Sequence, residues 1–357
     1  MNESTTQLLD AVLYADPGVF EKERDALFSQ HWWLIGTEPE LISKGEYITT
    51  TLGRFPIFVI RDENDKLNGF HNVCRHRAGP IFIDQAGKLS GNLLVCQYHG
   101  WCYNLQGQLK NAHRLNQSLD KSAHPLFPIR IAVWNKLVFA CIDQDAPPLT
   151  DWLGDITEIA KRFPTNVQMH PLGIVEKTGA TNWKCYGDNS CEGYHVGLVH
   201  KALGSSMDTD AVKIRCYEEG KFIGFDVTYS ASAADPSRQG KGFWIYKFPG
   251  LLLHFSENTF NAESVIPLSE RSIALKRWFW SLPPKASRSK TDPQEAVSSA
   301  SRVMDEDLQI CERVFENLSA GIYSSGVLST TDEPGTQFFQ KIVREFHRSI
   351  GLCKSIS

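Results

Sequence analysis

Two short stretches of the chain each combine a cysteine with a histidine. Cys74 and His76 stand in VCRHRAGP, Cys96 and His99 stand in VCQYHGW, and nineteen residues separate the two pairs. Each pair follows an apolar run with β character and precedes a turn marked by Gly or Pro, which predicts that both pairs sit at hairpin tips. Two such tips that face each other would supply two thiolates and two imidazoles to one metal site.

Three interpretations of this ligand set are open. The cysteines can be small core residues beside incidental histidines, or the four side chains can bind one structural zinc ion. They can also hold a Rieske [2Fe-2S] cluster, in which two thiolates bind one iron and two imidazoles bind the other. The alternation of Cys and His favours the cluster, because each hairpin then gives one ligand to each iron. Zinc sites more often take two cysteines from one knuckle.

A second set of candidate ligands lies further along the chain, in DNSCEGYHVGLVH. His195 and His200 are five positions apart, whereas residues four apart share a helix face. Two histidines and a carboxylate form the facial triad of non-heme Fe(II) oxygenases, although two packed histidines have the same spacing. If both rings bind one ion, a helix must widen or break between them. Gly193 and Gly197 lower the cost of that distortion.

The carboxylate of such a triad is expected on a helix at residues 294–319. In SRVMDEDLQICERVFENL, Asp307 falls near the middle of an apolar stripe when successive residues are placed about 100° apart. The other members of the stripe are Val303, Ile310, Cys311, Val314 and Leu318. A lone aspartate on an apolar face is costly unless it is paired or bound to a metal. Asp307 is therefore either a metal ligand or the partner of a buried arginine.

The stretches NVCRHRAGP and CQYHGWCYN resemble the cluster motif of the Rieske non-heme iron oxygenases, specifically of their catalytic α subunits. The resemblance includes DPGVFEKERDALFSQHWW, NWK at 182–184 and the E-D-x-x-x-x-E stretch at 306–312, and it is weakest at about 205–245. One departure is that relatives commonly have Arg-Gly after C-x-H, whereas this chain has Ala78 before Gly79. That change affects the turn of the loop and no ligand.

This resemblance implies two metal cofactors. The implied ligands of one [2Fe-2S] cluster are Cys74, His76, Cys96 and His99. The implied ligands of one mononuclear Fe(II) are His195, His200 and Asp307. O2 is then a co-substrate, and electrons from NAD(P)H arrive through a flavin and iron-sulfur reductase or a ferredoxin. Imidazoles in place of thiolates raise the potential of the cluster above that of an all-cysteine ferredoxin.

An acidic residue stands three positions before the first of these histidines. On a helix, Glu192 would lie beside His195. In the family the acid at this place binds no iron, and the resemblance implies that it carries electrons between subunits. Glu192 would bridge His195 to a Rieske histidine of a neighbouring subunit, either His76 or His99, which implies a homotrimer. Many relatives have Asp here, whereas a subset that includes carnitine-type oxygenases has Glu.

The resemblance further implies a terminal oxygenase component that hydroxylates or oxidatively demethylates a small organic substrate. Glu192 and the EDLQICE stretch favour a quaternary ammonium compound, and an aromatic ring or aromatic acid is the alternative. Aromatic walls suit both, since they stack on rings and attract cations. The stretch GFWIYKFPGLLLHF is expected to line the pocket, with strand alternation turning about half of its side chains away. The candidate pocket residues are Phe243, Trp244, Tyr246 and His254.

Two other classes of protein share part of the pattern. A Rieske electron carrier needs only the first ligand set, and the long part of the chain that follows that set argues against it. A zinc-stabilised binding module explains the first ligand set but not His195, His200 and Asp307.

The elements that must position these residues predict an α+β protein. Short β-rich runs from about Tyr47 to Ile142 predict an all-β Rieske domain at 46–150, and the PP of DAPPLTDWLG marks its end. Residues 1–45 predict a helical segment that packs on the catalytic domain. Residues 151–357 predict that domain, an antiparallel sheet covered by helices.

Composition limits the remaining choices. The chain has 357 residues, of which 42% are apolar and 22% charged, as in soluble globular proteins. The net charge of -4 gives no indication of a nucleic-acid partner. The N-terminus does not resemble a secretory signal, and no apolar run approaches the roughly 20 residues of a membrane span. Nine cysteines without a signal peptide predict a reducing compartment, so a cytoplasmic location without a membrane partner is expected.

Overall fold

The computed structural model divides the chain into two compact units. One unit is Asp25–Leu149, and the other combines Met1–Arg24 with Thr150–Ser357. The structure describes residues 7–115, 118–163, 169–230, 240–282 and 293–352. No helix in these ranges is long and apolar enough to cross a membrane.

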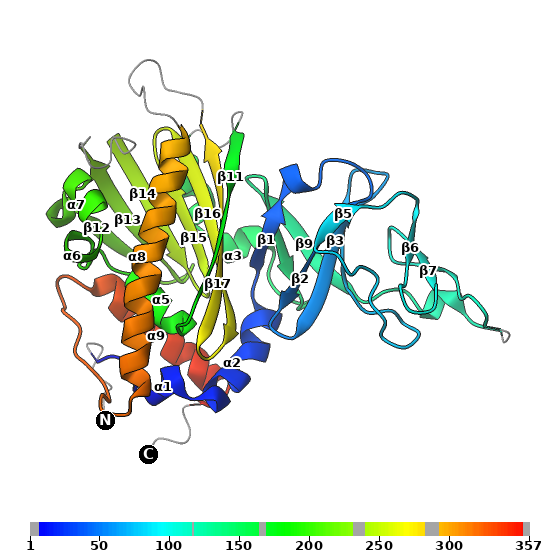
Figure 1. Cartoon of the computed structure of the whole chain (residues 1–357), viewed down its shortest axis with the longest axis horizontal. Helices are drawn as coiled ribbons and strands as arrows, with labels where there is room; N and C mark the ends of the chain where they lie inside the picture. Colours follow the sequence, from blue (N-terminus) through cyan, green and yellow to red (C-terminus); the bar gives the residue numbers. More distant parts are fainter. Residues whose placement is uncertain (1–6, 116–117, 164–168, 231–239, 283–292, 353–357) are drawn as a thin grey trace. The chain divides into compact units, whose positions relative to one another are not determined.

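Antiparallel strands build the unit Asp25–Leu149 (Figure 1). Its larger sheet has seven strands in the order β1-β10-β9-β4-β3-β2-β5, and its smaller sheet has three in the order β6-β7-β8. The strands of the larger sheet are β1 Trp33–Thr37, β2 Glu46–Leu52, β3 Phe55–Arg61, β4 Leu67–His71, β5 Ala86–Lys88, β9 Pro128–Trp134 and β10 Leu137–Cys141. Those of the smaller sheet are β6 Leu93–Val95, β7 Cys102–Asn104 and β8 Leu109–Asn111.

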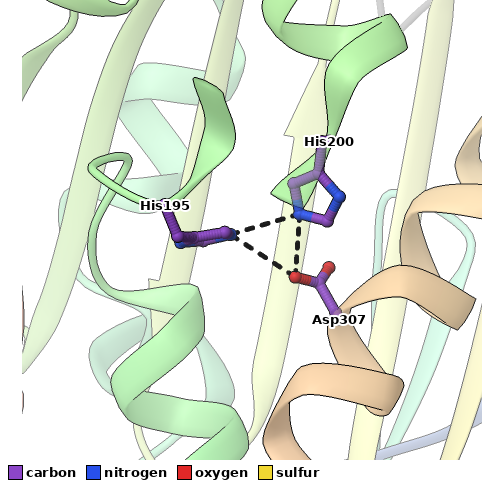
Figure 2. Close-up of side chains that lie close together, drawn as sticks. All are labelled: His195, His200 and Asp307. Atoms are coloured by element: carbon purple, nitrogen blue, oxygen red, sulfur yellow. Dashed lines mark hydrogen bonds and ion pairs between the residues drawn. The ribbon is translucent and has the colours of Figure 1, made fainter. Parts of the chain in front are cut away.

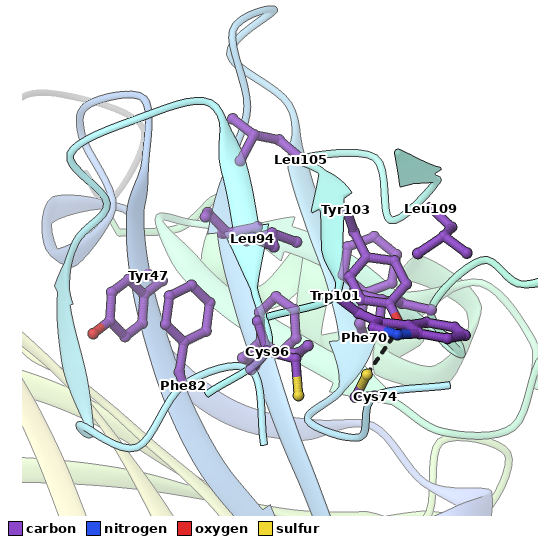
Figure 3. Packing of buried hydrophobic residues seen from close by; sticks show 14 residues of the cluster. Tyr47, Phe70, Cys74, Phe82, Leu94, Cys96, Trp101, Tyr103, Leu105 and Leu109 are labelled. Atoms are coloured by element: carbon purple, nitrogen blue, oxygen red, sulfur yellow. Dashed lines mark hydrogen bonds between the residues drawn. The ribbon is translucent and has the colours of Figure 1, made fainter. Parts of the chain in front are cut away.

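The core of this unit lies around β3. Four consecutive residues, Ile57 to Ile60, are fully buried, so both faces of the strand are covered. A strand covered on both faces reads as a continuous apolar run instead of an alternating one. Figure 3 shows the adjoining hydrophobic cluster, into which the β6–β7 hairpin inserts Leu94, Trp101 and Tyr103. The two segments that carry the Cys and His pairs are therefore anchored on a packed core.

One seven-stranded antiparallel sheet is the centre of the other unit. Its strand order is β11-β17-β16-β15-β14-β13-β12, so consecutive strands from β12 to β17 pair with each other. The bounds are β11 His170–Gly179, β12 Lys213–Tyr217, β13 Phe222–Tyr229, β14 Gly240–Lys247, β15 Leu251–Phe255, β16 Thr259–Ser269 and β17 Ser272–Ser281. The first strand of the unit, β11, forms one edge of the sheet and pairs with the last strand, β17.

Helices accompany this sheet, and Figure 1 shows the long helix α8 running along its strands. The helices are α1 Val12–Ala15, α2 Pro17–Gln30, α3 Leu149–Leu153, α4 Ile156–Ala160, α5 Trp183–Ser190, α6 Val196–Val199, α7 Lys201–Ser206, α8 Pro293–Ser319 and α9 Pro334–Ser349. Single 3₁₀ turns lie at Glu38–Glu40, Lys121–Ala123 and Thr209–Ala211. The predicted α+β class is confirmed: an all-β domain is joined to an antiparallel sheet with helices.

The unit boundaries differ from the sequence ranges of 1–45, 46–150 and 151–357. Strand β1 pairs with β10, and this pairing places Trp33–Thr37 in the β-rich unit. Only Met1–Arg24 groups with the second unit. The division falls between Arg24 and Asp25, inside α2. A continuous helix has no turn or Pro/Gly signal at such a position, so the sequence does not predict the boundary.

A buried charge cluster joins three helices of the second unit. Glu23 of α2 accepts hydrogen bonds from Lys184 Nζ of α5 at 2.7 and 2.9 Å, and it contacts His347 Nε2 of α9 at 2.5 Å. All three side chains are fully buried. Burial raises the pKa of Glu23, but Lys184 and His347 outweigh burial and hold this pKa below its usual value. The cluster therefore connects the N-terminal and C-terminal helices to α5.

We expect Lys184→Met to lower the free energy of unfolding by roughly 3–5 kcal/mol, because removing one partner leaves a buried carboxylate without its main counter-charge. Lys161→Met is the matched control, since Lys161 forms an exposed pair with Glu158 and should contribute less than about 1 kcal/mol. Urea unfolding followed by circular dichroism measures both. Equal effects of the two substitutions would show that the cluster does not stabilise the fold.

Candidate metal centres

The segment between α5 and α7 brings two histidines to one point. Helix α5 begins with Asn182 as its cap, whose side chain accepts a hydrogen bond from Lys184 N at 2.9 Å, and it ends at Ser190. After a loop, His195 begins the single turn of α6, and the chain then breaks at His200, which has φ −105° and ψ 71°. The expected widening or break between the two histidines is not found, because Val199 N donates to His195 O at 2.9 Å and His200 N to Val196 O at 3.0 Å, as in a regular helical turn. The interruption comes at His200 itself, where α6 ends and α7 begins.

His195, His200 and Asp307 converge on one point (Figure 2). The Nε2 atoms of the two histidines are 3.2 Å apart, and Asp307 Oδ1 lies 3.0 Å from His200 Nε2 and 3.5 Å from His195 Nε2. Asp307 comes from the middle of α8, more than 100 residues further along the chain. Since its side chain is largely buried and faces the histidines rather than an arginine, the alternative of a buried Asp–Arg pair is wrong.

These distances fit a single metal ion. Three ligand atoms on one face of an octahedron, each roughly 2.1 Å from the metal, lie about 3.0 Å from one another. Two neutral imidazole nitrogens and one carboxylate oxygen are the ligand types of the facial triad. Within the described part of the chain, this is the one group of three or more His, Cys, Asp or Glu residues whose ligand atoms all lie within 4.8 Å.

The electrostatics of the triad favour positive charge. Burial raises the pKa of Asp307, but hydrogen bonds with His195 and His200 outweigh it and hold that pKa well below its usual range. Burial lowers the pKa of His195, whereas Asp307 and Glu192 raise it to about 9. The pKa of His200 is also raised, because Asp307 and Glu306 outweigh burial. The carboxylates thus provide the negative surroundings that a divalent cation needs.

Three further side chains hold the triad in place. Glu192 bonds through Oε1 to His195 Nδ1, as the i−3 spacing predicts. Glu306 Oε2 lies 2.7 Å from His200 Nδ1, and Asn189 Nδ2 donates to Asp307 Oδ1 at 2.6 Å. Such outer contacts fix the tautomer and orientation of ligating side chains. The sequence interpretation missed Glu306 and Asn189 as contacts. The helical wheel placed Glu306 at the edge of the apolar stripe, and nothing in the sequence distinguishes Asn189 from other asparagines.

The first ligand set lies on two turns of the β-rich unit. Cys74 N donates to Gly79 O at 2.9 Å and Cys96 N to Trp101 O at 2.9 Å, which closes each turn. The thiols of Cys74 and Cys96 are neighbours whose interaction raises the pKa of Cys74, after the larger effect of burial. Figure 3 shows both sulfur atoms at the edge of the hydrophobic cluster, with Tyr103 Oη 3.1 Å from the Cys74 sulfur.

The two histidines of this set lie together. The rings of His76 and His99 have centroids 4.7 Å apart, and Trp101 stacks on His76 at 4.8 Å with an interplanar angle of 9°. His99 Nδ1 is buried and has no hydrogen-bond partner among the described residues, which fits an atom that binds a metal.

The spread of the four ligand atoms distinguishes between a zinc ion and a cluster. No three of them lie within 4.8 Å of one another, although all four residues are described. A tetrahedral zinc site has ligands about 2.0–2.3 Å from one ion and therefore demands a closer set. A two-iron cluster is wider, because each iron takes one pair of ligands. The geometry therefore fits the [2Fe-2S] group and not a single zinc ion.

Two adjoining cavities open beside the triad. One has a volume of about 70 Å³ and contacts all three triad residues together with Tyr186 and Phe225. The other has a volume of about 60 Å³ and extends along the sheet toward β17 and α8. The residues common to both linings are Trp244, His254 and Arg277.

Only half of the predicted pocket residues line these cavities. Trp244 and His254 do, and their rings stack with centroids 5.6 Å apart. Phe243 and Tyr246 do not, so their prediction is corrected. Phe243 points to the opposite face of β14, where the Arg162 guanidinium lies 4.5 Å above its ring. Tyr246 shares the face of Trp244, but its ring packs against Phe339 of α9 and its hydroxyl donates to Pro249 O at 2.8 Å.

Comparison with known proteins assigns the family. The family model of the ring hydroxylating alpha subunit (catalytic domain) matches residues 165–349, and that of the Rieske [2Fe-2S] domain matches residues 31–129. The chain belongs to the ring-hydroxylating oxygenase α-subunit family. It is a Rieske-type non-heme iron oxygenase, with a [2Fe-2S] cluster and a mononuclear iron as cofactors. The alternatives of an electron carrier and of a zinc-stabilised module are therefore wrong.

Individual relatives of this oxygenase act on quaternary ammonium compounds. The chloroplastic choline monooxygenase of Atriplex hortensis is 27% identical over 91% of this chain and 75% of its own length. The glycine betaine monooxygenase oxygenase subunit of Chromohalobacter salexigens is 33% identical over 55% of this chain and 45% of its own length. The structure of the quaternary ammonium Rieske monooxygenase CntA with L-carnitine has a TM-score of 0.82 at 22% identity, and the match covers 96% of each chain.

We expect Asp307→Asn to lose the mononuclear iron and keep the cluster, because an amide is a weaker ligand than a carboxylate. The intact oxygenase should contain about three irons and two acid-labile sulfides per chain, and the variant about two of each. Asp305→Asn is the control, since Asp305 lies on the same helix and pairs with Lys177 away from the triad. Unchanged iron in Asp307→Asn, measured by metal and sulfide analysis, would exclude Asp307 as a ligand.

Proposed function

We propose that this chain is the terminal oxygenase component that uses O2 and reductase-supplied electrons to hydroxylate or demethylate a small quaternary ammonium compound. The observation that carries the proposal is the compact cavity beside the triad, in which Tyr186, Phe225 and Trp244 surround the space next to His195 and His200. Aromatic faces attract a quaternary ammonium group through its positive charge, and desolvation strengthens that attraction. The names of the relatives support the same substrate class.

The size of the cavities supports a compact substrate. Their volumes of about 70 and 60 Å³ are small beside the roughly 300–1,000 Å³ of pockets for drug-sized ligands. An aromatic ring or aromatic acid remains the second candidate, because the same aromatic walls also stack on rings.

In this proposal the two ligand sets have separate tasks. The proposed ligands of the cluster are Cys74, His76, Cys96 and His99. The proposed ligands of the iron are His195, His200 and Asp307. Iron held by the second set would supply the chemistry that activates O2, and a cluster held by the first set would supply its electrons from a flavin and iron-sulfur reductase or a ferredoxin. Glu306 and Asn189 hold His200 and Asp307 in position, and the aromatic walls exclude water and orient the substrate.

We propose that Glu192 connects two copies of the chain. Its carboxylate bonds to His195 Nδ1, and its side chain lines both the triad cavity and an outer cavity of about 380 Å³. Beside that outer cavity, Ile310 and Val314 are 38% and 43% exposed. An acidic group next to a concave apolar surface suits contact with a second copy, and head-to-tail contacts of this kind close into a ring. A cytoplasmic homotrimer is the assembly we propose.

The substrate class can be tested by oxygen uptake. We expect the metal-loaded oxygenase with a surrogate reductase to couple O2 consumption to quaternary ammonium compounds, with aldehyde release where a methyl group is lost. Aromatic acids should not stimulate uptake above the rate without substrate. Coupled uptake with aromatic acids alone would overturn the proposed substrate class and favour the second candidate.

We expect Glu192→Gln to keep both metals and to lower turnover by roughly 10–100-fold, because the amide cannot serve as the charged partner of the histidine. Glu316→Gln is the control, since Glu316 lies on exposed α8 surface in a pair with Arg313. The readout is oxidation of the pre-reduced cluster by O2 in the presence of substrate.

Electron transfer between subunits can be separated from transfer within one subunit. Co-purified trimers that mix Cys74→Ala chains with Asp307→Ala chains should regain part of the activity, because one chain supplies the cluster and another supplies the iron. Mixed trimers as inactive as either parent, with cluster and iron both loaded, would contradict the bridge.

A further inference from the structure

The second cavity adjoins the triad cavity, and both combine aromatic and polar side chains. The second cavity adds Ser256, Asn258, Thr259 and Asn261 to the shared residues, together with the aromatic rings of Tyr229, Phe255 and Phe279. Trp244, His254 and Arg277 border both cavities, so the two cavities adjoin at these three side chains.

The register of the sheet brings the side chains of His254, Asn261 and Arg277 together. Residues directly opposite in antiparallel strands point to the same face. One row across β13 to β17 consists of Phe225, Trp244, His254, Asn261 and Phe279. In the next row on the same face, Glu263 of β16 lies opposite Arg277 of β17. His254, Asn261, Glu263 and Arg277 thus form a polar patch on a sheet face that also carries the aromatic rings of Phe225, Trp244 and Phe279.

Two of these groups have unused hydrogen-bonding capacity. Asn261 Oδ1 is buried and has no partner among the described residues, and no hydrogen bond of its Nδ2 to them is found. An asparagine amide can turn either end toward a ligand. Arg277 is almost fully buried and uses Nε and Nη2 to bind Glu263, which leaves other N–H groups of its five donors for a ligand. Buried polar groups of this kind normally have a partner.

We infer that Arg277 and Asn261, with His254 at their side, form a carboxylate subsite, and that the substrate is a zwitterion of the betaine type. A carboxylate only accepts hydrogen bonds, so it matches a guanidinium and an amide that present N–H groups. Arg277 and His254 border both cavities, whereas Asn261 lines only the second one. A bound zwitterion therefore places its carboxylate between Arg277 and Asn261 and its ammonium methyl groups in the triad cavity.

Glu263 adjusts the charge of this subsite. It neutralises Arg277 and receives a hydrogen bond from Tyr186 Oη at 3.0 Å. The pair keeps the cavity from repelling the ammonium group, while the free N–H groups still attract the carboxylate. Choline has a hydroxyl group in place of the carboxylate and would leave the donors unsatisfied, which disfavours it. This inference rests on the proposed function and narrows its substrate class.

The first experiment needs no variant. It compares γ-butyrobetaine with its methyl ester, which keeps the shape and the ammonium group but loses the negative charge, and adds glycine betaine and choline as a second pair. In each pair, we expect kcat/KM to be roughly tenfold or more higher for the compound with the carboxylate, γ-butyrobetaine or glycine betaine. A difference of this size is expected when hydrogen bonds to a charged group are lost.

The second experiment changes the subsite. Asn261→Asp places a negative charge beside the substrate carboxylate and should lower the carboxylate-to-ester ratio of kcat/KM by roughly tenfold or more. Asn261→Leu, which keeps the size of the side chain and removes its donors, should lower it in the same direction. Gln309→Glu, at an exposed site on α8, makes the same amide-to-carboxylate change outside the triad cavity, the second cavity and the outer cavity, and should leave the ratio unaltered. Arg277 is not substituted, because its loss would leave Glu263 buried without a partner.

The outcomes separate the two proposals. If the ester and choline react as well as the carboxylates, and both Asn261 variants alter all substrates equally, the subsite is wrong while the quaternary ammonium function stands. If no quaternary ammonium compound couples O2 uptake in the metal-loaded enzyme, both proposals fail. If the Asn261 variants do not fold, the carboxylate-to-ester ratio of the unaltered enzyme decides alone.

Discussion

Three electron-rich atoms from two parts of the chain meet within 3.5 Å of one another: those of His195 and His200, five residues apart, and that of Asp307, more than 100 residues further on. Such atoms repel one another unless a cation or protons lie between them, so the arrangement must be held by the structure around it. The backbone between α5 and α7 supplies this support by breaking at His200, and α8 supplies it by presenting Asp307 from an apolar face. The charge cluster of Glu23, Lys184 and His347 anchors α5, the helix that leads into the histidine loop.

Much of the two metal centres follows from the sequence, because ligand chemistry depends on residue type and short spacing. The Cys and His pairs predicted two hairpin tips, and Cys96 and His99 do lie in the β6–β7 hairpin, whereas Cys74 and His76 lie between β4 and β5, which do not pair with each other. The five-residue step predicted a break between His195 and His200, and the helix is interrupted at His200 itself. Asp307 emerged among 41 acidic residues because helical periodicity placed it on an apolar stripe. Each of these arguments uses contacts between residues near one another in sequence, where periodicity is informative.

The remaining features depend on contacts between distant segments. Strand alternation predicted that half of the candidate pocket residues would turn away, but it gave no way to tell that Trp244 faces the cavity and Phe243 does not. Tyr246 lies on the correct face, but its ring packs against Phe339 of α9 and its hydroxyl donates to Pro249 O, and the sequence predicted neither contact. Asn261 and Arg277 come to the cavity through the register of β15, β16 and β17, which is set by the whole sheet and not by any local motif.

The two histidines of the triad are held by different parts of the structure. His200 is bound at both ring nitrogens by consecutive residues of one helix, Glu306 at Nδ1 and Asp307 at Nε2, and it is almost fully buried. Its orientation can change only if α8 itself shifts. His195 is held at Nδ1 by Glu192, from a loop whose Tyr194 is 68% exposed. One histidine is thus fixed to the rigid interior and the other is coupled to the surface. A partner that docks at this loop would move His195 alone and leave His200 and Asp307 in place.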